Sequence, residues 1–206
     1  MSAARWARAL IYDAAIVGMT AAWYRAVLDR VPPQCRLLDV GIGTGGALLA
    51  NAAVVAAKQL RITGVDVDAA YIDRCRDAVA RHALADRIDA RHESVYEHRG
   101  GPYDAVYFSA SFMLLPDAPA ALRHVRTLLS TSGRIYFTQT FEHRQSATVE
   151  RVKPLLRAIT TIDFGRVTYE ADFRETLANA SYELVGTETL HAGPRRSAVL
   201  AIARAS

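Results

Sequence analysis

The sequence is poor in cysteine, and its first apolar run is short. Two cysteines, Cys35 and Cys75, are too few for a disulfide framework or for a four-cysteine zinc site. Asp13 interrupts the apolar run near the N-terminus, which is therefore shorter than a membrane-spanning helix requires. We expect a cytoplasmic protein without a transmembrane segment. The absence of acidic residues before Asp13 leaves an organellar transit peptide as the alternative.

Lysine is also rare, and this bears on possible partners. Of the 25 basic residues only Lys58 and Lys153 are lysine, and the arginines lie scattered from Arg5 to Arg204. The formal net charge of +4 would suit a nucleic-acid partner, but proteins that bind nucleic acid usually concentrate their charge on one face. We therefore expect no nucleic-acid partner. An RNA substrate would require the arginines to gather on one face after folding.

What the sequence does contain is an alternation of short apolar strands and helical segments. Strands are expected at 35–40, 61–68, 88–93, 103–109, 133–140, 182–190 and 196–205, and helices at 45–58, after 68, between 109 and 133, and at 169–180. Only about ten residues, 94–103, join the third and fourth strands, which is too short for a crossover helix. The pattern predicts one α/β domain over 1–206. Its fold would be a Rossmann-like, doubly wound, mostly parallel sheet that ends in an antiparallel hairpin.

A glycine-rich turn follows the first strand. The segment from Asp39 to Gly46 reads DVGIGTGG, and Asp66 ends the second strand 20 residues later. Glycines allow a tight turn and a close approach of the backbone to a ligand, and the helix behind the turn offers free N–H groups. A carboxylate at the end of the second strand can accept hydrogen bonds from both hydroxyls of a ribose. Together these features predict a nucleoside-containing cofactor at the carboxyl ends of the strands.

Two cofactor classes fit the glycines. Gly41, Gly43 and Gly46 satisfy the dinucleotide pattern G-x-G-x-x-G, whereas Gly41, Gly43 and Gly45 satisfy D/E-x-G-x-G-x-G. Asp39 favours the second pattern, because an acid there would repel a pyrophosphate and attract a cationic amino group. The short third connection and the final hairpin favour it too.

The second pattern is the first motif of the class I S-adenosylmethionine-dependent methyltransferases, which the sequence resembles over nearly its whole length. LLDVGIGTGG is similar to their first motif, GVDVD to the ribose-binding segment and YDAVYFSASFMLLPD to the fourth-strand motif. The resemblance implies S-adenosyl-L-methionine as cofactor and a seven-stranded sheet whose last strand is reversed.

The resemblance also implies roles for individual residues. Asp39 would hold the methionine amino group, Asp66 the ribose hydroxyls, Glu93 the exocyclic amine of adenine and Ser94 a ring nitrogen. Further cofactor contacts are expected from Gly41, Gly43, Gly45, Val67, Ser109 and Tyr12. Where the family often has Gly-Asp after the third strand, this chain has His92-Glu93, which departs from the pattern.

The methyl acceptor is less well defined. The chain lacks the N/D-P-P-Y/F box after the fourth strand, the acid pair of arginine-directed enzymes and the Asp-Asn metal pair of catechol-type O-methyltransferases. We therefore expect a metal-independent methyltransferase of small molecules, by O- or N-transfer. His143 is the candidate general base. The region 1–31 would form a lid helix or a homodimer contact, and 141–168 a substrate or lid insertion. The alternatives are a catalytically silent partner subunit and an NAD(P)-dependent oxidoreductase.

Overall fold

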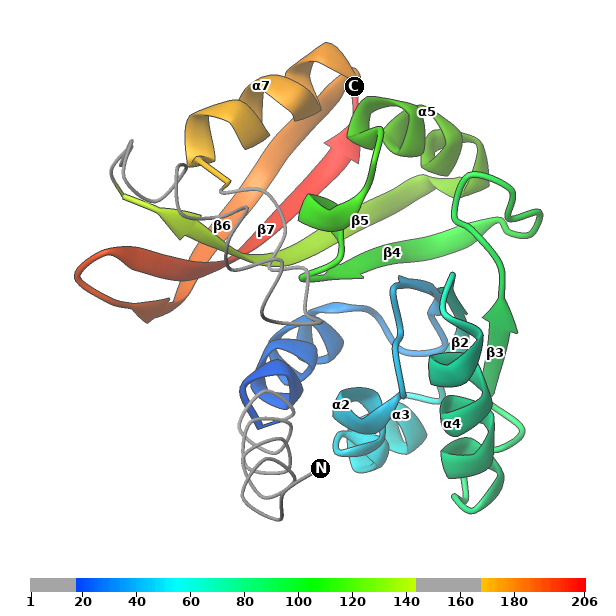
Figure 1. Ribbon diagram of the computed structural model, residues 1–206. Helices are drawn as coiled ribbons and strands as arrows, with labels where there is room; N and C mark the ends of the chain where they lie inside the picture. The colour runs from blue at the N-terminus through cyan, green and yellow to red at the C-terminus, as the bar shows by residue number, and fades with distance from the viewer. Residues whose placement is uncertain (1–17, 144–167) are drawn as a thin grey trace.

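The computed structural model describes residues 18–143 and 168–206, and their strands form one sheet (Figure 1). The seven strands are β1 (Arg36–Val40), β2 (Arg61–Asp66), β3 (Ile88–His92), β4 (Tyr103–Ser109), β5 (Leu129–Glu142), β6 (Tyr182–Ala192) and β7 (Arg196–Ala205). They lie in the order β3-β2-β1-β4-β5-β7-β6. Only β7 is reversed, since it pairs antiparallel with both β5 and β6. This arrangement confirms the predicted fold class.

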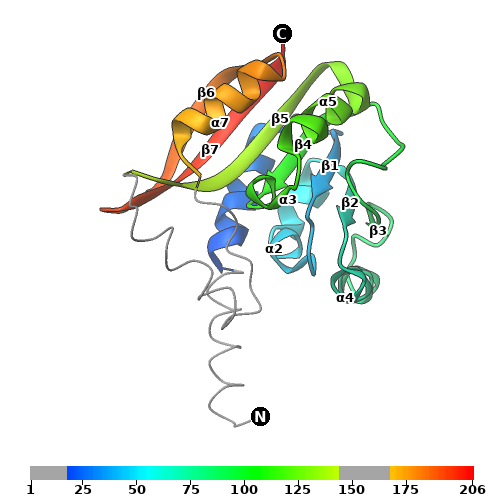
Figure 2. The ribbon, with the colours of Figure 1, turned by 45° about the horizontal axis from the view of Figure 1, so that its top comes forward.

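Helices cover both faces of the sheet. A helix spanning residues 18–30, α2 (Gly46–Leu49), α3 (Ala52–Ala57) and α4 (Ala69–Ala80) pack on one face, and α5 (Ala118–Leu128) and α7 (Glu170–Asn179) pack side by side on the other (Figures 1 and 2). Each face has its own apolar core, because side chains alternate along every strand. None of the helices in these two ranges is long and apolar enough to cross a membrane.

The helix starts follow from local side-chain hydrogen bonds. Asp68 accepts hydrogen bonds from the backbone N–H groups of Ala70 and Tyr71 and so caps the start of α4. Asp117 does the same for α5 through the N–H of Ala120. Such caps satisfy N–H groups that have no partner inside the helix and typically contribute about 1 kcal/mol each.

Three elements differ from the expected boundaries. The single helix expected at 45–58 is two short helices, because Asn51 interrupts it by donating hydrogen bonds of 2.9 Å to the carbonyls of Ala21 and Ala47. The second strand ends at Asp66, two residues earlier than expected, because Asp68 already caps α4. The fifth strand begins at Leu129, which pairs with Tyr103, and extends beyond 140 because β7 pairs with it as far as Glu142. The connection between β3 and β4 contains no helix, as expected.

The described part of the expected lid helix belongs to the core. Val27, Leu28 and Val31 are fully or almost fully buried and pack against β1 and α3 residues in one apolar cluster. Residues 18–31 therefore fix the position of the first strand. The remainder of this region and most of the expected insertion at 141–168 lie outside the described residues.

Candidate cofactor site

The glycine turn after β1 has the backbone that its sequence predicts. Gly41, Gly43 and Gly45 all have positive φ angles, of 81°, 59° and 73°. A β-carbon at Gly41 would lie 2.6 Å from Cβ of Ser111, and one at Gly45 would lie 2.7 Å from Sγ of Cys75. By contrast, no atom lies within 4 Å of the position of a β-carbon at Gly43. Two glycines thus serve packing within the protein, and Gly43 leaves open space above the turn.

Asp39 is the buried acid of this site. Its side chain is 0% exposed, although it lies on β1 only two residues before the glycine turn. Tyr24, from the helix at 18–30, donates a 2.8 Å hydrogen bond to Oδ2 of Asp39. The other oxygen, Oδ1, has no hydrogen-bond partner among the described residues. A buried carboxylate oxygen without a partner is costly, so this atom is prepared for a donor from a ligand.

Asp66 lies across the turn from Asp39, at the carboxyl end of β2. The N–H of Gly43 donates to its Oδ2 and the N–H of Asp68 to its Oδ1, both at 2.9 Å. These bonds fix the carboxylate beside the glycine turn. Since a carboxylate has about four acceptor positions, each oxygen can still accept a hydroxyl hydrogen.

The surroundings of Asp39 favour its uncharged form. Its pKa is raised to about 7, mainly by burial and to a smaller extent by the charge of Asp66, while the hydrogen bond from Tyr24 lowers it. Burial also raises the pKa of Tyr24 well above its usual value, so its hydroxyl stays a donor. A site with two adjacent carboxylates attracts a cationic group and repels a pyrophosphate.

The residues expected to contact adenine have partners of their own within the protein. Val67 is 72% exposed and available to a flat ring. The Oε1 atom of Glu93, however, lies 2.6 Å from Nδ1 of His98, and Nε2 of His98 lies 2.8 Å from the hydroxyl of Tyr103. His98 is fully buried and holds the carboxylate of Glu93 in place from the protein interior. Ser94 accepts a hydrogen bond from the N–H of Tyr96 through its Oγ.

The tip of β4 forms the far side of the site. Ser109 ends the strand, and Ala110 follows with a φ of 53°, a left-handed conformation that is unusual for alanine. The N–H of Ala110 donates to the carbonyl of Thr138 at 2.8 Å, and Ser111 donates to the carbonyl of Val40. These bonds tie the tip of β4 to β5 and to the glycine turn. Backbone strain of this kind is common at functional sites.

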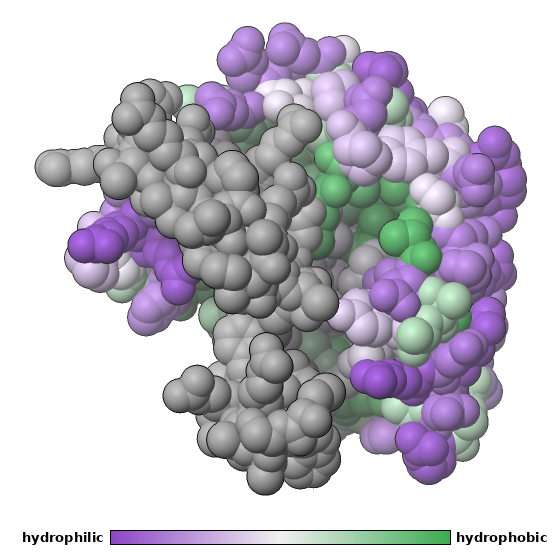
Figure 3. Space-filling view, viewed as in Figure 1, coloured by the Kyte–Doolittle hydropathy of each residue, from purple (hydrophilic) through white to green (hydrophobic). Residues whose placement is uncertain are grey.

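The space-filling view shows a hollow in the middle of the face seen in Figure 1 (Figure 3). It lies between the half of the molecule that carries α5 and the half that carries α2 and α4, and apolar surface is visible inside it. The glycine turn and the tip of β4 belong to these two halves.

One expected site residue, His143, is not brought to this edge. His143 lies five residues beyond Thr138, the residue that pairs with Ser109, which is roughly 17 Å along the strand. It is exposed, its Nε2 lies 2.7 Å from Oγ of Ser197, and no hydrogen bond among the described residues links it to the glycine turn. Tyr12 lies outside the described residues.

Two further residues of the site carry no local signal in the sequence. Tyr24 donates a hydrogen bond to Asp39 and packs edge-on against Tyr107, with ring centroids 4.9 Å apart. His98 reaches Glu93 through a loop conformation that has no sequence periodicity.

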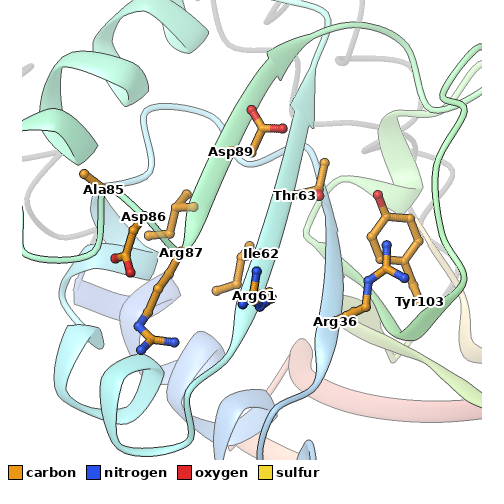
Figure 4. Close-up of a pocket in the computed structure, with 10 residues that line it drawn as sticks. Arg36, Arg61, Ile62, Thr63, Ala85, Asp86, Arg87, Asp89 and Tyr103 are labelled. Atoms are coloured by element: carbon orange, nitrogen blue, oxygen red, sulfur yellow. The ribbon is translucent and has the colours of Figure 1, made fainter.

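A pocket of about 530 Å³ lies at the opposite edge of the sheet (Figure 4). It is lined by the first residues of β1 to β4, among them Arg36, Arg61 and Tyr103, and by Arg87. The guanidinium of Arg36 lies over the ring of Tyr103, 5.6 Å from its centroid. Because the pocket is at the amino ends of the strands, it is separate from the site at Asp39 and Asp66. In the described parts of the chain, no group of three or more His, Cys, Asp and Glu side chains is placed to hold a metal ion.

Comparisons with known proteins agree with this geometry. Residues 37–133, which include Asp39, the glycine turn, Asp66 and Glu93, match the family model described as "Methyltransferase domain". A search of curated proteins found no match.

Solved structures share the fold at low sequence identity. The [4+2]-cyclase SpnF has a TM-score of 0.73 and 18% identity, with 90% of this chain and 81% of that chain covered. The geranyl diphosphate C-methyltransferase of Streptomyces coelicolor A3(2), solved with Mg²⁺, geranyl diphosphate and S-adenosyl-L-homocysteine, has a TM-score of 0.71 and 14% identity, covering 92% and 77%. A putative sarcosine dimethylglycine methyltransferase from Galdieria sulphuraria has a TM-score of 0.70 and 14% identity, covering 91% and 86%.

The matched segment contains the glycine turn and both acids, and the fold around it is shared with methyltransferases. Residues 37–133 therefore match a methyltransferase domain, and the fold of the described residues is similar to that of solved methyltransferases.

Proposed function

We propose that this protein is a metal-independent methyltransferase that binds S-adenosylmethionine between Asp39 and Asp66 and methylates the oxygen or nitrogen of a small molecule. The observation that carries the proposal is the buried Asp39, whose Oδ1 has no partner among the described residues although its Oδ2 is bound by Tyr24. An ammonium group would satisfy this oxygen. A nicotinamide dinucleotide would bring a pyrophosphate to the same place.

The other residues of the site fit the rest of the cofactor. Gly43 leaves room for the methionyl part because nothing lies near its missing side chain. Asp66 is held by two backbone N–H groups and keeps acceptor positions for two ribose hydroxyls. Val67 and Ser94 would contact the adenine, with Glu93 positioned by His98 to accept its exocyclic amine.

When bound, S-adenosylmethionine supplies a methyl group on a positively charged sulfur, which needs no further activation. The protein would align the acceptor with the methyl group and exclude water from the site. Asp39 would hold the amino group of the cofactor and Asp66 its ribose hydroxyls, and Ser109 and Ala110, at the tip of β4, would lie where acceptor and donor meet. Alignment of reactants alone can lower a barrier by roughly 7–11 kcal/mol. A general base is required only where the acceptor is a weak nucleophile at neutral pH.

The test is a calorimetric titration of the wild-type protein with S-adenosylmethionine, S-adenosylhomocysteine and NAD in parallel, with and without a chelator. We expect micromolar binding of the two sulfur compounds, unchanged by the chelator, and no binding of NAD. Binding of NAD alone would overturn the proposal in favour of an oxidoreductase. Binding of the sulfur compounds without any release of S-adenosylhomocysteine from metabolite mixtures would favour the silent partner subunit.

A further inference from the structure

Gln139 is a buried polar residue without a partner. It lies near the carboxyl end of β5 and is 1% exposed, yet neither Oε1 nor Nε2 makes a hydrogen bond in the described structure. An amide can accept two hydrogen bonds and donate two. Leaving both ends unpaired in a buried place is rare in native proteins and indicates a role other than packing.

The surroundings of Gln139 are aromatic. Phe137 and Phe141 precede and follow it by two residues on β5, so all three side chains lie on the same face of the sheet. The rings of both phenylalanines contact Phe173 of α7, at centroid distances of 5.1 and 5.4 Å. Phe112 of the 3₁₀ helix after β4 contacts Phe137 and Phe173 as well. These rings offer no acceptor and no N–H or O–H donor to the amide.

The strand register places this amide beside the reaction edge. Ser109, the last residue of β4, pairs with Thr138, and the N–H of Ala110 binds the carbonyl of Thr138. Gln139 is the next residue, so β4 ends one step before it, about 3.3 Å along the strand. The side of β5 that faces β4 is therefore no longer covered by that strand at Gln139. On its other side Gln139 pairs with Val199 of β7.

We propose that Gln139 binds the methyl acceptor, and that the acceptor carries an uncharged group able to donate and accept hydrogen bonds on an aromatic or apolar body. This inference rests on the proposed function for the position of the reaction edge. A carboxamide or hydroxyl matches both ends of the amide, whereas an ionic group would lose its hydration on the buried, apolar face that carries Phe137 and Phe141. Gln139 does not titrate, so it is a positioning residue of the acceptor and not a base.

The first part of the test measures binding of two probes, benzamide and ethylbenzene, by ligand-observed NMR on protein saturated with S-adenosylhomocysteine. Benzamide has a ring with a donor and an acceptor, and ethylbenzene has a ring of similar size without either. We expect the wild type to prefer benzamide by about tenfold, which corresponds to one net hydrogen bond. Equal affinity for the two probes in the wild type would overturn the inference.

The second part compares Gln139→Met with Thr138→Val. Gln139→Met keeps the length of the side chain and removes the unpaired amide, so we expect a higher melting temperature, loss of the benzamide preference and unchanged binding of ethylbenzene. Thr138 is a matched neighbour whose Oγ1 is paired, 2.7 Å from the hydroxyl of Tyr107. Thr138→Val should lower the melting temperature and keep the preference. Gln139→Leu replaces the methionine variant if that variant does not fold.

Two readouts separate this inference from the proposed function. A benzamide preference that survives in Gln139→Met contradicts the role of Gln139, whether the melting temperature rises or falls. Calorimetry on the same samples reports S-adenosylhomocysteine binding independently of the probes. If that binding is absent, the proposed function fails, and the probe preference is then measured on the cofactor-free protein, where its loss in Gln139→Met still supports the amide site.

Discussion

The hydroxyl of Tyr24 donates a 2.8 Å hydrogen bond to Oδ2 of Asp39 and leaves Oδ1 of that carboxylate without a partner. A buried acid held on one side only is poorly stabilised in its charged form, which is why its pKa is raised to about 7. The same arrangement makes Asp39 an acceptor for a cationic ligand. The charged carboxylate of Asp39 therefore lowers the stability of the ligand-free protein and at the same time favours binding of the ligand.

The free energy of unfolding should therefore depend on pH through the charge of Asp39. The pKa of Asp39 is about 7 in the folded state and near 3.8 in the unfolded chain, so the folded state binds more protons between these values. Stability must then fall as pH rises from about 4 to about 7, and level off above that range. Between pH 5 and pH 8 we expect the cofactor-free wild type to lose on the order of 2–3 kcal/mol relative to Asp39→Asn. Urea unfolding of both proteins at several pH values measures this difference. The prediction is contradicted if the unfolding free energies of the two proteins change with pH in parallel.

Tyr24→Phe should destabilise the charged form of Asp39 beyond the effect of burial. The hydrogen bond from Tyr24 lowers the pKa of Asp39, so its removal raises that pKa and leaves a second oxygen unpaired. We expect a loss of about 1–3 kcal/mol in unfolding free energy at pH 8. The pH at which S-adenosylhomocysteine binding reaches half of its maximum should move upward.

Tyr182→Phe is the matched control for Tyr24→Phe. Tyr182 is also buried, and its hydroxyl donates to the carbonyl of Leu122 at 3.1 Å, far from the glycine turn. This variant should lose stability without any change in the pH dependence of binding. The same upward shift in both variants would show that Tyr24 acts on binding only through general stability.

Gly43→Ala should separate cofactor binding from folding. A methyl group at Gly43 meets no protein atom within 4 Å, so only the left-handed backbone opposes it, at about 1 kcal/mol. We expect near-normal unfolding and at least tenfold weaker binding of S-adenosylhomocysteine by calorimetry. Gly41→Ala should instead lose much more stability, because its β-carbon would lie 2.6 Å from Ser111. Unchanged affinity in Gly43→Ala would place the cofactor elsewhere.

His143→Ala tests the general base expected from the sequence. Because His143 is exposed and roughly 17 Å along β5 from the tip of β4, we expect kcat to stay within about twofold of the wild type once an acceptor is found. Steady-state rates at pH 6 and pH 8 measure this. A loss of 100-fold or more at both values would restore His143 as the base.

The fold and the cofactor edge could be predicted from the sequence because their signals are local. Strands alternate with helices at regular spacing, and the turn at Gly41 and Gly45 needs glycines where positive φ angles and close neighbours occur. Asp39 is the next-to-last residue of β1, and Asp66 is the last residue of β2. Such features depend on neighbours in the chain, so a single sequence displays them.

Contacts between distant segments could not be predicted in this way. Asn51 interrupts a helix because it reaches Ala21, 30 residues earlier. Glu93 is engaged by His98 only because the loop at 93–102 folds back on itself. Gln139 looks like an ordinary polar residue of a strand, and only the folded structure shows that it is buried on the face of β5 where Phe173 packs against Phe137 and Phe141. Each depends on tertiary packing, which leaves no periodic signal.

The most direct test of the central claim compares S-adenosylhomocysteine with 5′-methylthioadenosine, which lacks the amino-acid part, on Asp39→Asn, Asp66→Ala and the control Asp68→Ala. We predict that Asp39→Asn weakens S-adenosylhomocysteine by roughly 10- to 100-fold and leaves 5′-methylthioadenosine unchanged, because only the former carries the amino group. Asp66→Ala should weaken both by a similar factor, since both contain the ribose. Asp68→Ala, which removes the cap of α4, should change neither affinity. Equal effects of Asp39→Asn on the two compounds, or no effect of Asp66→Ala, would contradict the account.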